Sequence, residues 1–176
     1  MTTRRTAASI RTGRFGTRHT GYGLKAVPRR IDRKSRTVNQ PVNNHAVELP
    51  VALIALLGQA SPCYLATSMP DGSPQLTQTW VDTDGDHVLI NTVNGHQKVK
   101  NIGLDPRVAL TVFDPAEPAR YFEVRGRVLR VTPDGAVDHI EKLSQRYLGR
   151  PYPWFGGRDQ QRLIVTIRPD RINSMG

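Results

Sequence analysis

The segment 91–101 combines the side chains and the turn that an anionic ligand needs. Thr92 ends an apolar, strand-like run, Gly95 supplies a turn, and Lys98 falls in a short basic helix. A strand that leads through glycine into a helix directs backbone N–H groups, hydroxyls and a cation toward one point. Lys98 and Asn101 share a helical face because they are three residues apart. The pattern predicts a phosphate-binding site, with an ordinary basic surface helix as the alternative.

Other kinds of reactive centre find no support in the sequence. The single cysteine, Cys63, cannot form an internal disulfide, and the five histidines show no metal-ligand spacing. No carboxylate pair has acid–base spacing, and no nucleophile has a companion base. A proton would come from solvent or from Tyr121, Tyr152 or His96. Redox chemistry by a cysteine pair and a structural zinc site are therefore excluded.

Six strand-like runs and two or three short helices must position these residues. The strands are expected at 63–69, 75–82, 88–93, 107–113, 120–131 and 163–167, and turn sequences separate them. The helices are expected within 47–57, at 96–102, and at 134–148 with Asp134 as N-cap; Gly58, Gly103 and Gly149 stop them. Strands at hairpin spacing predict a mainly β, six-stranded antiparallel barrel. A doubly wound nucleotide fold is not expected, since no G-x-G-x-x-G signature is present.

The second of these runs has two faces of different character. Leu76, Gln78 and Trp80 alternate with Gln75, Thr77, Thr79 and Val81. Alternation with period two indicates a half-buried strand, and one of its faces is lined by hydroxyls.

The positive charge of the chain is confined to its beginning. The chain has 25 Lys and Arg against 15 Asp and Glu, and residues 1–45 hold eleven of the bases and one of the acids. That leaves 14 of each sign in residues 46–176, which are expected to form one domain. The Arg-rich extension 1–45 lacks apolar periodicity and is predicted to be disordered. It is either a solvated tail, which we favour, or an arm that binds nucleic acid.

No stretch of about 18 apolar residues is present, so a membrane-spanning helix is not expected. The pair Arg4-Arg5 is not followed by the apolar run of a signal peptide, because Arg11, Arg14 and Arg18 interrupt the region. We therefore expect a cytoplasmic protein.

From about residue 48 to residue 176, the order and spacing of several motifs resemble the split β-barrel flavin and deazaflavin proteins related to pyridoxamine 5′-phosphate oxidase. The motifs are 70–75 (PDGSPQ), 84–86 (DGD), 98–102 (KVKNI), 105–109 (DPRVA) and 123–126 (EVRG). The combination of Asn91-Thr92, Gly95, Lys98 and Asn101 with Tyr147-Leu148-Gly149 is most similar to the branch that uses coenzyme F420, an anionic deazaflavin.

This resemblance implies a split β-barrel that binds F420, or alternatively FMN, usually as a homodimer with sites at the subunit interface. By resemblance, Lys98 would hold the cofactor's phosphate or pyrimidine edge. The other implied cofactor-binding residues are Thr77, Thr79, Asn91, Thr92, His96, Gln97 and Asn101. Many relatives carry arginine where this chain has His96 or Gln97, so F420 and FMN both stay open. Arg120, Tyr121, Tyr152, Trp154 and Phe155 are candidates for the opposite wall.

The function implied by the resemblance is an F420-dependent reductase that transfers a hydride between F420 and a conjugated small molecule. An FMN-dependent oxidase or reductase on the same barrel is the enzymatic alternative. The third possibility is a non-catalytic cofactor carrier whose arm, residues 1–45, binds nucleic acid.

Overall fold

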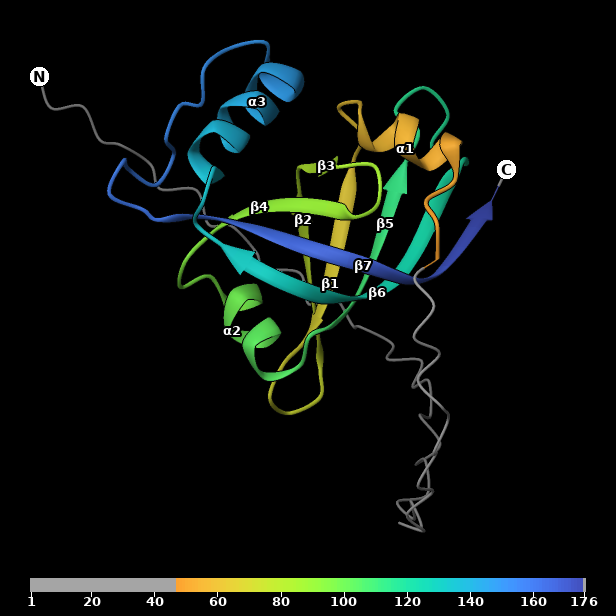
Figure 1. Cartoon of the computed structure of the whole chain (residues 1–176), viewed down its shortest axis with the longest axis horizontal. Helices are drawn as coiled ribbons and strands as arrows, with labels where there is room; N and C mark the ends of the chain where they lie inside the picture. Colours follow the sequence, from red (N-terminus) through yellow and green to blue (C-terminus); the bar gives the residue numbers. More distant parts are fainter. Residues whose placement is uncertain (1–46, 176) are drawn as a thin grey trace, which may run out of the picture. The chain divides into compact units, whose positions relative to one another are not determined.

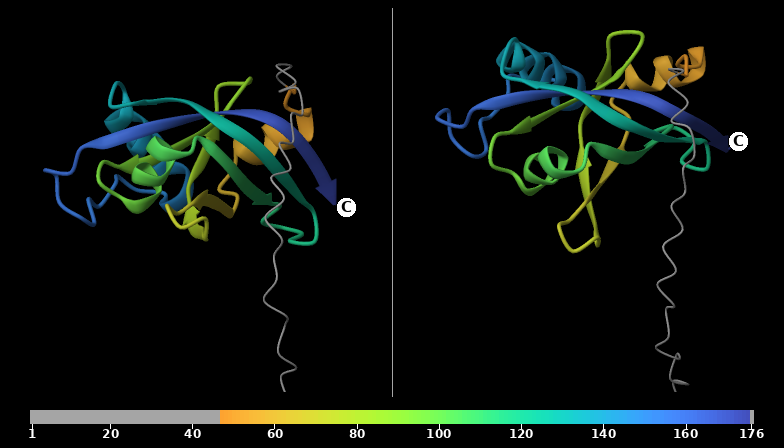
Figure 2. Two further views of the ribbon diagram at one scale, coloured as in Figure 1. Left: turned by 90° about the horizontal axis from the view of Figure 1, so that it is seen from below. Right: turned by 60° about the horizontal axis from the view of Figure 1, so that its bottom comes forward.

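Antiparallel pairing joins seven strands into one sheet that curls on itself (Figures 1 and 2). The computed structural model describes residues 47–175, and its strand order is β2-β1-β5-β6-β7-β4-β3. The strands are β1 (Cys63–Ser68), β2 (Pro74–Thr79), β3 (Val81–Thr83), β4 (Val88–Val93), β5 (Arg107–Phe113), β6 (Tyr121–Thr132) and β7 (Arg162–Met175). This mainly β half-barrel confirms the predicted fold class. The arm predicted over residues 1–45 lies outside the described residues.

The seventh strand arises because the predicted strand 75–82 is divided at Trp80. Before this residue, β2 pairs with β1, and after it, β3 pairs with β4. Since β2 and β3 are the two edges of the sheet, the chain passes from one edge to the other through a single residue. The curl of the sheet makes this crossing possible, so Trp80 joins the two edges of the half-barrel.

The last strand is longer than predicted because it changes partners along its length. It pairs with β4 up to Ile167 and with β6 from Ile164 onward, so after Ile167 it continues along β6 alone. The β6–β7 ladder shifts register at Gly126. A Cβ atom at this position would lie 2.2 Å from the Arg168 carbonyl oxygen. Only glycine allows the two backbones to approach this closely.

The core lies on the concave side of the curled sheet. Alternate residues of β1 and β5 point into it, as the period of two requires, and α1 (Val51–Leu57) closes one end. The most deeply buried core side chains are Leu53, Leu57, Leu65, Ile90, Val112, Val124, Val165 and Ile167. On β2, the threonines face inward and Leu76 and Gln78 face outward, so the predicted alternation is confirmed.

Each of the three helices packs against a different part of the sheet (Figure 1). Helix α1 ends at Gly58 as predicted, α2 (Gln97–Leu104) runs one residue past Gly103, and α3 (Ala136–Leu148) ends at Gly149 with the expected left-handed conformation. The prediction that Asp134 caps α3 is wrong. Gly135 is the N-cap residue, and the Asp134 carboxylate instead accepts a 2.9 Å hydrogen bond from the Thr132 hydroxyl.

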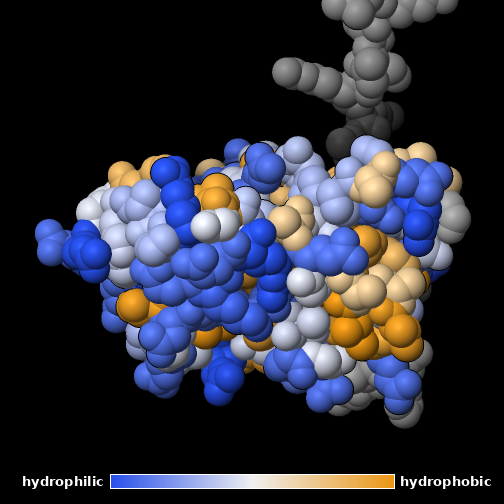
Figure 3. Space-filling model, turned by 90° about the horizontal axis from the view of Figure 1, so that it is seen from above, coloured by the Kyte–Doolittle hydropathy of each residue, from blue (hydrophilic) through white to orange (hydrophobic). Residues whose placement is uncertain are grey.

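Apolar side chains gather on one part of the surface on the side of α1 and α3, next to a largely hydrophilic part (Figure 3). The exposed apolar residues of the described chain include Val51 at 84% and Leu76 at 65%. Between residues 47 and 175, no helix is long and apolar enough to cross a membrane.

Candidate functional site

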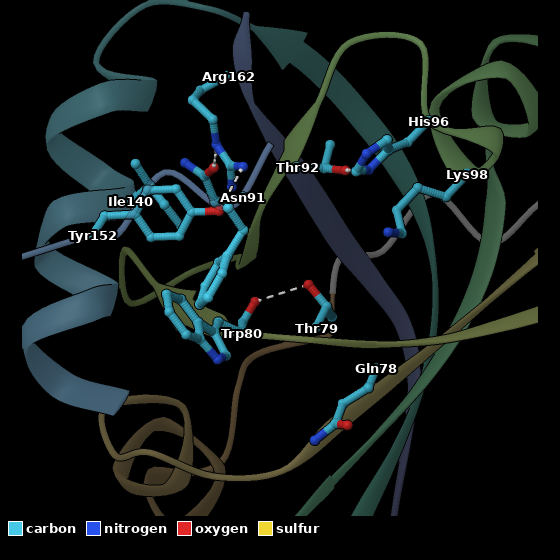
Figure 4. A pocket seen from close by; sticks show the side chains of 11 residues that line it. Gln78, Thr79, Trp80, Asn91, Thr92, His96, Lys98, Ile140, Tyr152 and Arg162 are labelled. Atoms are coloured by element: carbon cyan, nitrogen blue, oxygen red, sulfur yellow. Dashed lines mark hydrogen bonds between the residues drawn. The ribbon is translucent and has the colours of Figure 1, made fainter. Parts of the chain in front are cut away.

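A pocket of about 380 Å³ opens where α3, β4 and the end of β2 face the start of α2 (Figure 4). Its walls combine cations, hydroxyls and aromatic rings. They are formed by Gln78, Thr79, Trp80, Asn91, Thr92, His96, Lys98, Ile140, Tyr152, Phe155 and Arg162. Five of these eleven residues are among those that the sequence predicts to bind a cofactor: Thr79, Asn91, Thr92, His96 and Lys98.

Three basic side chains face this pocket, and no carboxylate from residues 47–175 lines it. Among the described residues, neither Lys98, Arg162 nor His96 forms a salt bridge, although most other bases of the barrel do. Burial lowers the pKa of Lys98, and the charge of Arg162 lowers it further. Burial lowers the pKa of His96 as well, followed by the charges of Lys98 and Arg162. The pocket therefore holds an uncompensated positive charge that an anion would relieve.

Arg162 is fixed in this cluster by neighbours from β4 and from the loop that follows α3. Its residue is only 7% exposed, and its Nε donates a 2.8 Å hydrogen bond to Asn91 Oδ1 on β4. One terminal nitrogen lies 3.4 Å from the Tyr152 hydroxyl oxygen, and the guanidinium carbon lies 5.1 Å from the centre of the Tyr152 ring. At the start of β7, Arg162 is paired in register with Val93, which brings it opposite the predicted segment 91–101.

Aromatic rings form the second wall of the pocket. Trp80 stacks on Tyr147 of α3, with centroids 5.1 Å apart and planes 15° from parallel, and meets the edge of Tyr152 at 6.0 Å. The Tyr147 hydroxyl donates to the Ser61 carbonyl oxygen at 2.8 Å and accepts from the Val81 amide at 3.2 Å. Burial raises the pKa of Tyr147 to about 12, so this phenol stays protonated. Trp80 therefore presents a fixed, flat surface to the pocket.

Behind the pocket, the buried carboxylate of Asp82 contacts three basic side chains of α3. Asp82 lies 2.6 Å from Lys142 Nζ, 2.9 Å from Arg146 and 3.3 Å from His139 Nε2, and its side chain is 3% exposed. Burial alone would raise the pKa of Asp82, but its contacts with His139, Lys142 and Arg146 outweigh burial and hold this pKa well below its usual range. The cluster attaches α3 to β3, and so attaches one wall of the pocket to the sheet.

The remaining three predicted residues lie away from the pocket. The fully buried Asn101 amide donates to Thr67 Oγ1 at 2.9 Å and to Gln75 Oε1 at 3.1 Å, and its own oxygen accepts from Gln97 Nε2 at 2.8 Å. The bonds to Thr67 and Gln75 attach α2 to the β1–β2 hairpin, and the Gln97 side chain is occupied in holding the Asn101 amide within the helix. The Thr77 hydroxyl is buried inside the barrel, with no hydrogen-bond partner in the described part of the chain.

Sequence reasoning did not select Arg162 or assign Trp80 to the site. Arg162 comes directly before the apolar run of the last strand, and a charged residue at the start of a buried strand was the available signal. Many relatives carry an arginine at the position of His96 or Gln97. In this chain the guanidinium of the pocket comes instead from Arg162, at the start of β7. The aromatic loop residues Tyr152 and Phe155, predicted as an opposite wall, line the pocket of the same subunit.

The curled sheet and its cation-lined pocket are those of a split-barrel protein. Residues 49–176 match the family described as "Pyridoxamine 5'-phosphate oxidase", and the chain belongs to this family of flavin-binding oxidoreductases. A search of curated proteins returned no match.

Among solved structures, one titled "F420 Reductase" is 34% identical, with 71% of this chain and 98% of that chain covered and a TM-score of 0.63. The conserved hypothetical protein Rv2991 from Mycobacterium tuberculosis is 26% identical, over 74% of this chain and 86% of that one, with a TM-score of 0.59. A putative pyridoxamine 5'-phosphate oxidase from Listeria innocua shares the fold at 19% identity, with coverage of 70% and 94% and a TM-score of 0.54.

Proposed function

We propose that this protein is an F420-dependent reductase of the split-barrel class. The observation that carries the proposal is the group of unpaired bases, Lys98, Arg162 and His96, beside the flat surface of Trp80 in one pocket. Such a pocket suits a ligand that combines a planar ring system with negative charge, which describes a deazaflavin with an anionic tail. The 34% identity to a structure titled "F420 Reductase" supports the same assignment.

The residues divide into two sets by their chemistry. Lys98 and Arg162 would hold the anionic part, with the Thr92 and Thr79 hydroxyls as additional hydrogen-bonding groups. Trp80 and Tyr152 would limit the position of the ring and exclude water from one side of it. When bound, F420 supplies a hydride to an electrophilic carbon of a conjugated substrate.

Tyr152 is the side chain best placed to provide a proton. Its oxygen accepts from Arg162, so its own hydrogen is free to point into the pocket. The loop that carries it is held to α3, because the Tyr152 amide donates a 2.8 Å hydrogen bond to Glu141. We assign Tyr152 the role of hydrogen-bond donor to the substrate, with solvent as the alternative proton source.

The proposed assembly is a homodimer that shares its sites between subunits. The exposed Phe155, 73% accessible at the rim of the pocket, and the apolar area of Figure 3 supply surface for a second copy to cover. Light scattering on the full chain tests this assembly, and a monomeric mass across micromolar concentrations would contradict it.

FMN is the second candidate cofactor, because the family binds flavins and FMN also joins a planar ring to a phosphate. The charge of the pocket suits both molecules. Titration of the purified full chain with F420 and separately with FMN, followed by ring fluorescence, separates them. Tighter binding of F420 and its use as a hydride donor are expected. Binding of FMN alone would favour the flavin-dependent alternative, and binding of neither would refute the proposed function.

A matched pair of variants tests whether the proposed pocket is the binding site. Lys98→Ala removes a pocket cation, whereas Lys100→Ala removes an exposed cation of the same helix that does not line the pocket. Weaker binding is expected from the first variant only. Equal losses would indicate general electrostatic attraction in place of a defined site.

A further inference from the structure

A chain of polar contacts runs from the buried Asp82 to the pocket, through residues that the proposed reaction does not itself use. Asp82 faces His139, His139 faces Asn91, and Asn91 faces Arg162. All four residues are at least nine-tenths buried, so their donors and acceptors must match one another rather than water.

The orientation of the Asn91 amide is fixed from two sides. Its Nδ2 donates a 2.7 Å hydrogen bond to the Ala136 carbonyl oxygen, which can only accept. Its Oδ1 accepts a 2.8 Å hydrogen bond from Arg162 Nε, which can only donate. A carbonyl oxygen can only accept and a guanidinium N–H can only donate. If the amide were turned over, its oxygen would face the Ala136 oxygen and its nitrogen would face Arg162 Nε, and both hydrogen bonds would be lost.

This orientation decides the protonation of His139. The Nδ1 of the ring lies 3.4 Å from Asn91 Nδ2, which has a second hydrogen to donate, so Nδ1 must be the accepting nitrogen. On the other side of the ring, Nε2 lies 3.3 Å from Asp82 Oδ2, and within residues 47–175 no atom completes a hydrogen bond with it. A lone pair on Nε2 would face the carboxylate oxygen, so Nε2 must hold the hydrogen.

We propose that His139, with its Nε2 hydrogen directed at Asp82, is a positioning residue that accepts the second Asn91 hydrogen and so helps to hold Asn91, and through it the Arg162 guanidinium of the pocket, in place. His139 does not line the pocket, and it acts only through Asn91. The inference deepens the proposed function, because it treats Arg162 as part of the binding site for the anionic cofactor. It also gives the first turn of α3 a part in shaping the pocket.

Two variants of His139 and one control variant at a different histidine distinguish this role from simple packing. His139→Leu fills space but removes the acceptor, so one Asn91 hydrogen is left unpaired. His139→Asn places an amide oxygen near the position of Nδ1 and restores that acceptor. His87→Leu removes a partly buried histidine whose ring lies 3.1 Å from Asp84 Oδ2 at the β3–β4 turn, and it serves as the control.

Nitrogen NMR on the labelled full chain provides a readout that does not need a cofactor. The His139 ring, identified by its loss in His139→Leu, should show protonated Nε2 and unprotonated Nδ1 at neutral pH. The Arg162 Nε–H signal, identified with Arg162→Lys, should exchange slowly in the wild type. It should exchange faster and shift in His139→Leu, while His139→Asn and His87→Leu retain the wild-type signal.

In the same series, the affinity for F420 should fall roughly tenfold in His139→Leu and recover in His139→Asn. A hydrogen on Nδ1 in the wild type, or an unchanged Arg162 Nε–H signal in a folded His139→Leu, would overturn the inference. If His139→Leu does not fold, the inference is tested by two other results: the tautomer of His139 in the wild type and the Arg162 Nε–H signal in His139→Asn. If these NMR results hold while the wild type binds neither F420 nor FMN, the proposed function fails and the positioning role stands.

Discussion

Arg162 Nε donates to Asn91 Oδ1 over 2.8 Å, which joins the first residue of β7 to the middle of β4 inside the candidate pocket. This bond uses one of the five guanidinium N–H donors to hold the side chain in position. The terminal nitrogens are left to bind Tyr152 and a ligand. A lysine could supply the charge but not this combination of a fixed anchor and free donors.

Arg162→Ala should therefore weaken F420 binding by about 1–3 kcal/mol, because a charge-assisted contact is lost from a partly enclosed site. Arg162→Lys should recover only part of the loss. The control is Arg158→Ala, which removes an exposed arginine that packs over Trp154 outside the pocket lining. Fluorescence titration measures each affinity. If Arg162→Ala bound F420 as tightly as the wild type, Arg162 would not be part of the binding site.

Lys98→Ala should weaken cofactor binding by a similar amount, about 1–3 kcal/mol, and should leave thermal stability nearly unchanged. Its ammonium has no ion-pair partner among residues 47–175, and burial lowers its pKa, so the folded barrel gains little from the charge. Calorimetric titration and a thermal melt measure the two effects. A large loss of stability with no change in affinity would contradict this assignment.

Asp82 should make stability fall in acid. Its folded pKa lies below its unfolded value, so its stabilising contribution is fully present above the unfolded pKa, near 4, and is lost as the pH falls further. Asp82→Asn should be less stable than the wild type at pH 7, by about 3 kcal/mol. Urea unfolding at several pH values measures both chains. The gap between them should narrow below about pH 4, and a constant gap would count against the assignment.

Gly126→Ala should destabilise the barrel by about 2–3 kcal/mol, since the added methyl group meets the Arg168 carbonyl oxygen across the β6–β7 ladder. Gly103→Ala is the matched control, because no heavy atom lies within 4 Å of the added Cβ in α2. That substitution should stabilise slightly, as alanine is the better helix former. Denaturation midpoints compare the two variants, and equal midpoints would mean that the ladder adapts at Gly126.

Local patterns predicted most of the sheet. The strands 88–93 and 107–113 have the predicted bounds because alternation and flanking turns define them within a few residues. The division at Trp80 could not be read this way. It depends on which edge each half of the segment pairs with, and the sequence of 75–82 contains no turn signal to mark the change.

The site was predictable where it is contiguous in the sequence. Thr92, His96 and Lys98 follow one another along a strand, a turn and a helix, and the structure brings all three to the pocket. Asn101 shares their segment, but its side chain is fully buried beneath α2, which helical spacing alone does not distinguish from a pocket position. Arg162 joins them only through the pairing of β4 with β7, a contact between distant segments.

The aromatic wall also gives the protein an optical probe of its own. The sequence contains two tryptophans, Trp80 and Trp154, and both have edge contacts with Tyr152. Ultraviolet emission from the unlabelled chain therefore originates beside the pocket, and quenching or energy transfer to an arriving chromophore would report occupancy directly.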